Sequence, residues 1–155
     1  MNLTFIRHGD AVKLAKSDEE RTLTDKGKED IKKIGLFLKK AFERYDVIIS
    51  SPYIRALETA NIIADILGMQ NNVITDPRLG CGSNFFKIKD VVNENKNFKN
   101  ILFSGHAPDM GIITAELLGT ANQIDFHKGS IMKVELNFFR TNDANLRFFI
   151  SPEQI

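Results

Sequence analysis

The sequence lacks several features that mark specialised classes of protein. It contains one cysteine, Cys81, so no internal disulfide can form and nothing requires an oxidising compartment. The first apolar run, residues 3–6, is too short for the hydrophobic region of a signal peptide, and no basic stretch precedes it. No continuous apolar segment is long enough to cross a bilayer. We therefore expect a cytoplasmic protein with no membrane partner.

An excess of charge of one sign is also missing. The 21 basic and 20 acidic side chains nearly cancel, so the whole molecule has no strong field to attract nucleic acid or an anionic membrane. A local pocket can still be strongly basic. We therefore expect no nucleic acid among the partners of this protein.

The chain has no internal repeat, no low-complexity tract and no linker rich in proline or glycine. With 155 residues, of which 43% are hydrophobic, it is long enough to bury a core of its own. We expect a single domain over residues 1–155.

Apolar runs that suit strands alternate with segments of helical periodicity. Strands are expected at residues 3–7, 46–50, 73–74, 100–104, 131–139 and 146–150, the last two joined by a turn at 141–143. Helices are expected from the N-cap Thr24 to Phe42, from Pro52 to Leu67, over 86–96, and after Pro108 as far as Leu118, with Gly68 and Gly119 as stop signals. This alternation predicts an α/β fold, a three-layer α/β/α sandwich with a mostly parallel central sheet.

Polar clusters follow three of the expected buried strands. Arg7-His8-Gly9 ends the first, Ser50-Ser51-Pro52 ends the second with Arg55 one helical turn later, and Ser104-Gly105-His106 ends the third. In an open α/β sheet the ligand crevice lies beyond the carboxyl ends of the strands. We therefore expect these side chains to surround one crevice.

The residue types in this crevice suit a phosphoryl group. The forked donors of arginine match phosphate oxygens, and helix N-termini favour an anion. A neutral imidazole can attack phosphorus and form a covalent phosphohistidine, which splits one difficult displacement into two easier ones. A second, protonated imidazole can stabilise charge on the transferring group. The pattern predicts a phosphate-processing site.

Three segments, in this order, resemble the signatures of the histidine phosphatase superfamily, also called the phosphoglycerate mutase-like family. They are Arg7-His8-Gly9, residues 50–60 (SSPYIRALETA), which resemble S-x-x-x-R-A-x-x-T-A, and Ser104-Gly105-His106. The resemblance implies a phosphoglycerate mutase-like fold and phosphatase activity. It implies that His8 is the nucleophile and that Arg7, Arg55 and His106 complete the phosphate pocket.

A fourth segment narrows the resemblance to one branch. Residues 21–27 (RTLTDKG) resemble the R-x-L-T-x-x-G segment of the short, SixA-type phosphohistidine phosphatases. This implies that Arg21 also reaches the phosphate, that no metal or cofactor takes part, and that the substrate is a protein bearing phosphohistidine. The chain between the Arg55 helix and the third buried strand is too short for a lid, which suits a phosphoryl group displayed on a protein.

The sequence departs from the superfamily in one respect. Many phosphomonoesterases of the family place a proton-donating glutamate after the strand that follows the Arg55 helix, and residues 76–84 (DPRLGCGSN) contain none. An alkoxide leaves poorly without a proton, whereas the P–N bond of phosphohistidine is labile and its imidazole can be protonated beforehand. Asp10 and Asp76 remain open as proton donors.

Several alternatives remain at this point. Cys81 and Lys87 have the spacing of a C-x5-R phosphatase loop, but lysine lacks the bidentate fork and no helix-capping pattern is expected directly after them. Arg21 can instead pair with Glu19 or Glu20, and His127 is given no role. The alternative functions are a phosphatase of small phosphomonoesters and a module that binds phosphate or phosphoproteins without turnover.

Overall fold

A single six-stranded sheet runs through the computed structural model, which describes residues 1–155. Its strands are β1 (Asn2–Arg7), β2 (Val47–Ser50), β3 (Val73–Thr75), β4 (Asn100–Gly105), β5 (Ile131–Leu136) and β6 (Ala144–Ile150). They lie in the order β3-β2-β4-β1-β5-β6. The four strands β1, β2, β3 and β4 run parallel to one another. β5 is antiparallel to both of its neighbours, β1 and β6. The predicted mostly parallel sheet is confirmed.

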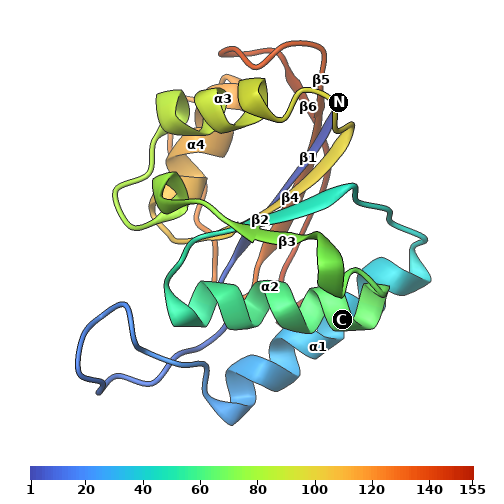
Figure 1. The fold of residues 1–155 in the computed structure, drawn as a ribbon. Coiled ribbons are helices and arrows are strands. Elements are labelled where there is room, and N and C mark those ends of the chain that lie inside the picture. The colour runs from blue at the N-terminus through green and yellow to red at the C-terminus, as the bar shows by residue number, and fades with distance from the viewer.

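Helices cover both faces of this sheet (Figure 1). α1 (Asp25–Lys40) and α2 (Ile54–Leu67) lie on one face, and α3 (Phe85–Glu94) and α4 (Asp109–Leu118) lie on the other. Each pair of helices encloses an apolar core against the sheet, and the two cores contain 12 and 19 buried residues respectively. The predicted three-layer α/β/α sandwich is confirmed. Three short 3₁₀ helices, η1 (Gln70–Asn72), η2 (Pro77–Leu79) and η3 (Pro152–Gln154), complete the structure.

The central strands are apolar because both of their faces are covered. All four residues of β2 are buried, and in β1 and β4 only the end residues are partly exposed. Strands covered on both sides require near-continuous apolar sequence rather than alternation. This explains why the runs that end at Arg7, Ser50 and Gly105 are recognisable in the sequence, and why polar residues begin where the covered part of the sheet stops.

The ends of the helices and strands follow local chemistry, with some differences from the predicted bounds. Thr24 caps α1 by accepting a hydrogen bond from the Gly27 amide at 3.0 Å, as expected. α1 ends at Lys40, and Phe42 lies beyond it, exposed and with a φ of 57°. α2 begins at Ile54 rather than at Pro52, which precedes its N-cap Tyr53. β5 ends at Leu136, three residues earlier than predicted.

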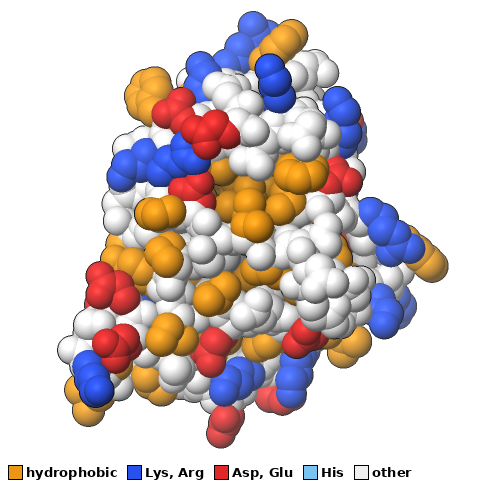
Figure 2. All heavy atoms as spheres, in the orientation of Figure 1, with side chains coloured by type: hydrophobic (Ala, Val, Ile, Leu, Met, Phe, Trp, Pro, Cys, Tyr) orange, Lys and Arg blue, Asp and Glu red, His pale blue; other side chains and the backbone are white.

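The surface carries charges of both signs. On the face seen in Figure 2, basic and acidic side chains are interspersed and apolar side chains gather between the two helix layers. No helix has the length and apolar character needed to span a membrane.

Candidate active site

Strand register brings the three polar clusters to one edge of the sheet. Arg7 lies opposite Gly105 in the β1–β4 pair, and Ser50 lies opposite Ser104 in the β2–β4 pair. One residue further on, the His8 amide donates to the Gly105 carbonyl at 3.0 Å and the Ser51 amide donates to the Ser104 carbonyl at 2.9 Å. The residues after β1, β2 and β4 therefore emerge side by side, because parallel strands end together.

Gly9 is required by the close packing of the chain after β1. A Cβ at this position would lie 2.9 Å from the carbonyl oxygen of Gly27 in the first turn of α1. The Gly9 amide donates to Thr59 Oγ1 at 3.2 Å, and that hydroxyl donates to the Arg55 carbonyl at 2.8 Å. His8 is thus held between α1 and α2 by the residues that flank it.

His8 presents an unprotonated ring nitrogen to the site. Its Nδ1 lies 2.7 Å from the Gly9 carbonyl oxygen, and Arg55 Nε donates to its Nε2 over 3.1 Å. A carbonyl only accepts, and the guanidinium only donates, so we assign the ring proton to Nδ1 and the lone pair to Nε2. Burial, aided by the nearby arginines, lowers the pKa of His8 to about 4. The ring is therefore neutral at pH 7.

His106 completes the site from β4. Its ring centroid is 5.3 Å from that of His8, and its Nε2 lies 2.8 Å from Ser51 Oγ. Ser51 Oγ accepts from the Tyr53 amide at 3.2 Å and its hydroxyl proton has no acceptor other than Nε2, so we direct that proton to Nε2 and assign the His106 ring proton to Nδ1. Nδ1 is buried without a hydrogen-bond partner, which leaves this N–H available to an acceptor.

The expectation of a protonated His106 is corrected for the free protein. Burial, with the added effect of His8 and Arg55, lowers the pKa of His106 to about 3, so the ring is neutral at pH 7. A neutral His106 can still donate from Nδ1 to an oxygen of a bound anion.

Arg55 is the central cation of the site, hydrogen-bonded to both His8 and Asp18. While Nε faces His8, one terminal nitrogen donates to the Asp18 carbonyl at 2.5 Å and the other donates to Asp18 Oδ2 at 3.0 Å. Arg21 approaches from the loop before α1, donating from one terminal nitrogen to Asp18 Oδ1 at 2.9 Å and from Nε to the Val12 carbonyl at 2.7 Å. One carboxylate therefore bridges two arginines beside the nucleophile.

Arg7 lies at the end of β1 with an incompletely used guanidinium. One terminal nitrogen donates to the Phe126 carbonyl at 2.7 Å, and its Nε is buried without a partner. Together with Arg21 and Arg55, the charge of Arg7 lowers the pKa of His8. The structure thus gathers the predicted residues Arg7, Arg21, Arg55 and His106 around His8.

The role of Asp18 was not predicted from the sequence. Arg21 was expected to pair with Glu19 or Glu20, and its partner is Asp18 instead. Nothing in the local sequence distinguishes this aspartate from the two glutamates that follow it. Ser51, in contrast, belongs to the recognised segment of residues 50–60, where its spacing from Arg55 was a usable signal.

Asp10 and Asp76 are both committed to other partners. Asp10 accepts from Thr24 Oγ1 at 2.8 Å and from Lys128 Nζ at 2.5 Å, and these bonds lower its pKa. Asp76 caps η2 and pairs with Arg78, which also lowers its pKa. Both carboxylates are ionised at neutral pH, so neither has a proton to donate to a leaving group.

Cys81 lies at the rim of the site, with its Sγ 3.8 Å from a terminal nitrogen of Arg55. The expectation of no helix cap after it is wrong, because Asn84 caps α3 by accepting from the Lys87 amide at 3.0 Å. Lys87 Nζ donates to the Gly82 carbonyl and makes no contact with the sulfur. Partial burial raises the pKa of the thiol, which disfavours the thiolate that a cysteine phosphatase needs.

Two other features complete the inventory of the site. His127 is exposed and faces Asp125 at 3.3 Å, and it makes no contact with His8. No group of three or more His, Cys, Asp or Glu side chains is arranged to hold a metal ion.

A neutral imidazole whose unprotonated Nε2 faces Arg55, with two further guanidinium groups and a second imidazole nearby, defines a site for phosphoryl chemistry on histidine. Comparison with known proteins agrees with this class. The profile of the histidine phosphatase superfamily (branch 1) matches residues 3–80. A phosphohistidine phosphatase SixA homolog of Haemophilus influenzae is 30% identical over 143 residues, covering 86% of this chain and 87% of that protein.

Two further relatives extend over almost the whole chain. Phosphohistidine phosphatase SixA of Escherichia coli is 27% identical over 154 residues, covering 98% of this chain and 94% of its own. The structure of the protein histidine phosphatase SixA complexed with tungstate superposes with a TM-score of 0.91 at 24% identity, covering 99% of both chains. The chain belongs to the histidine phosphatase superfamily, and its predicted resemblance to the SixA-type branch is confirmed.

Proposed function

We propose that this protein is a phosphohistidine phosphatase that acts on a protein substrate through a covalent phosphohistidine on His8. The observation that carries the proposal is the lone pair of His8 Nε2, held unprotonated at neutral pH beside Arg55. The names of the SixA relatives that match most of the chain support the same activity.

In the first step, His8 Nε2 attacks phosphorus in line with the bond to the leaving group. A new N–P bond forms on Nε2, and the P–N bond of the substrate breaks with its electron pair going to the leaving imidazole. Arg7, Arg21 and Arg55 hold the phosphoryl oxygens together with the Nδ1–H of His106. The fold holds these groups beside His8 before substrate binds. Arg21 and Arg55 then exchange the Asp18 carboxylate, and Arg55 Nε exchanges its bond to His8 Nε2, for bonds to the phosphoryl group.

In the second step, water attacks the phosphoryl group on His8. An O–P bond forms, the N–P bond breaks, and the electron pair returns to Nε2, which regenerates the neutral ring. The proton of the attacking water ends on the released phosphate or in solvent. The hydrogen bond from Nδ1 to the Gly9 carbonyl keeps the ring in the same tautomer throughout the cycle.

The ionised state of Asp10 and Asp76 favours phosphohistidine over phosphomonoesters as the substrate. An alkoxide needs a general acid, whereas an imidazole that is already protonated on its other nitrogen leaves as a neutral molecule. Because Asp10 and Asp76 are ionised and held by other groups, a substrate that needs no acid fits best. No metal or cofactor enters the proposed cycle, and a cytoplasmic location stays a prediction.

The test compares phosphate release from a small protein carrying phosphohistidine and from a phosphoserine peptide, with a chelator present. The wild-type protein should dephosphorylate phosphohistidine only, and His8→Ala should lower the rate by about four orders of magnitude. Equal release from phosphoserine would make the protein a general phosphomonoesterase. Release from neither substrate would contradict the proposal and favour a module that binds phosphate without turnover.

A further inference from the structure

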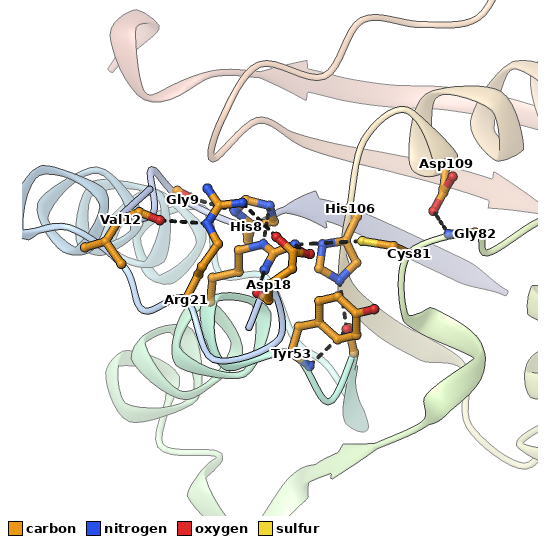
Figure 3. Close-up of polar contacts among 12 residues, drawn as sticks. His8, Gly9, Val12, Asp18, Arg21, Tyr53, Cys81, Gly82, His106 and Asp109 are labelled. Carbon is orange, nitrogen blue, oxygen red and sulfur yellow. Dashed lines mark hydrogen bonds and ion pairs between the residues drawn. The ribbon is translucent and has the colours of Figure 1, made fainter. Parts of the chain in front are cut away.

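Asp18 occupies the donors that a phosphoryl group needs. Its two carboxylate oxygens accept from Arg21 and Arg55 at 2.9 and 3.0 Å, and no other carboxylate pairs with either arginine. In Figure 3, Asp18 lies in front of His8, between Arg21 and Cys81. A carboxylate that bridges two guanidinium groups imitates the anion for which such groups are suited.

The arrangement allows the carboxylate to leave without disturbing Arg55. The side chain of Asp18 is 55% exposed, whereas that of Arg55 is 4% exposed. The backbone carbonyl of Asp18 separately holds a terminal nitrogen of Arg55, and the next carbonyl, of Glu19, accepts from the Ile54 amide at 2.9 Å. Rotation of the Asp18 side chain into solvent therefore frees two arginine donors while the backbone of the loop keeps Arg55 in place.

We propose that the Asp18 carboxylate competes with phosphate oxygens for the donors of Arg21 and Arg55. It releases both arginines when a phosphoryl group binds and pairs with them again when phosphate leaves. This inference rests on the proposed function, because it needs a phosphoryl group at His8. Three guanidinium groups around one anion would retain the product strongly. A carboxylate that takes back two of them weakens that retention, and product release limits turnover in many enzymes.

This role makes Asp18 a positioning residue that acts through the arginines. Its effect on ground-state anion binding has the opposite sign to that of a residue that only maintains structure. Removing an internal competitor tightens the binding of phosphate and lowers KM, without an increase in kcat. Loss of a structural contact would weaken binding and raise KM.

The experiment measures the binding of inorganic phosphate and of tungstate to the whole protein by calorimetry at pH 7. The variant Asp18→Asn keeps the size of the side chain and removes its charge. Because the pair is half exposed, we expect its Kd for either anion to fall roughly five- to tenfold. Its KM for phosphohistidine should fall in parallel, with product inhibition by phosphate appearing at lower concentration.

Glu20→Gln is the matched control, since Glu20 lies on the same loop, is exposed, and pairs with no arginine. It makes the same change in net charge and should leave the Kd within twofold of wild type. If both variants bound the anions equally more tightly, the effect would come from the change in net charge alone. That result would overturn the inference. Unchanged or weaker anion binding in Asp18→Asn would also overturn it.

The outcomes separate this inference from the function on which it rests. If the wild-type protein binds neither anion and His8→Ala does not alter phosphate release, the proposed function fails. If the wild type binds phosphate and turns over phosphohistidine but Asp18→Asn binds no tighter, only the role of Asp18 fails.

Discussion

Two arginines near the carboxyl edge of the sheet differ in the balance of charge around them. Arg78, after β3, lies between Asp76 and Glu94, so one guanidinium meets two carboxylates. Arg55, after β2, shares a single carboxylate with Arg21. The first cluster has surplus negative charge and the second has surplus positive charge.

Burial and neighbours sharpen the contrast. The side chain of Arg78 is 31% exposed and all its contacts are with carboxylates, whereas that of Arg55 is 4% exposed and its Nε faces the imidazole of His8. A buried surplus of guanidinium groups beside a basic nitrogen favours the binding of an anion. An arginine with more carboxylates than it can neutralise only ties segments together. Charge balance, rather than the presence of arginine, distinguishes the site from the structural cluster.

The largest expected effect in this comparison comes from replacing Arg55, but not Arg78, by lysine. Arg55→Lys keeps the charge but loses the fork that reaches His8 and a phosphate oxygen together, so kcat/KM for phosphohistidine should fall roughly 10²- to 10³-fold. Arg78→Lys should leave kcat/KM within twofold. Steady-state kinetics of the two variants test the comparison directly, and a similar loss in both would erase it.

Acid should destabilise the protein through the two buried imidazoles. The pKa values of His8 and His106 are lowered to about 4 and about 3, and in the unfolded chain they return to about 6.5. The unfolded state therefore binds more protons below pH 6.5, and the free energy of unfolding falls as the pH falls. Between pH 7 and 5 the loss should be roughly 1–2 kcal/mol for each imidazole.

Urea denaturation at pH 7, 6 and 5 measures this loss, and His106→Asn should lose less stability than the wild type over the same range. An NMR titration in which both imidazoles change charge near pH 6.5 would show that burial beside the arginines does not lower their pKa values, and would contradict the prediction.

The ion pairs of Arg78 with Asp76 and Glu94 should contribute to stability but not to activity. Arg78→Ala removes the partner of Asp76 and Glu94 and should lower the free energy of unfolding by about 1 kcal/mol, with phosphatase activity unchanged. Arg140→Ala, which breaks a more exposed pair with Asp143, serves as the control and should cost less. A large loss of activity in Arg78→Ala would place that cluster in the site after all.

The smallest effect is expected at Cys81. Although its sulfur contacts Arg55, the raised pKa of the thiol and the absence of a contact from Lys87 give it no chemical role. Cys81→Ser should leave kcat/KM within about twofold, a surface-like effect. Loss of activity in a variant whose His8 is still phosphorylated would make the cysteine a participant.

Much of the fold was predictable because local chemistry decides it. Thr24 caps a helix wherever its hydroxyl meets a free amide, and Gly68 and Gly119 end helices in the left-handed conformation, with φ of 73° and 69°. Covered strands must be apolar, so the runs before His8 and His106 were recognisable. Phe42 misled the prediction because its helical spacing continues the pattern of α1, although no packing partner covers it.

The gathering of the site residues was also predictable, because parallel strands carry their carboxyl ends to one edge. The protonation states and ion-pair partners of these residues were not predictable. That His8 and His106 are neutral depends on their burial in the folded chain, and the pairing of Asp10 with Lys128 depends on the tertiary structure. Lys128 is 118 residues from Asp10 in the chain.

The sequence by itself determined which residues form the layers and which side chains follow β1, β2 and β4, since periodicity, capping and strand ends act over short stretches of chain. Only the tertiary structure decided the charge of each histidine, the partners of the acidic residues, and the choice of Asp18 over Glu19 and Glu20 as the counter-ion of Arg55. Desolvation and ion pairing depend on distances between segments that are far apart in the chain, and no local pattern encodes those distances.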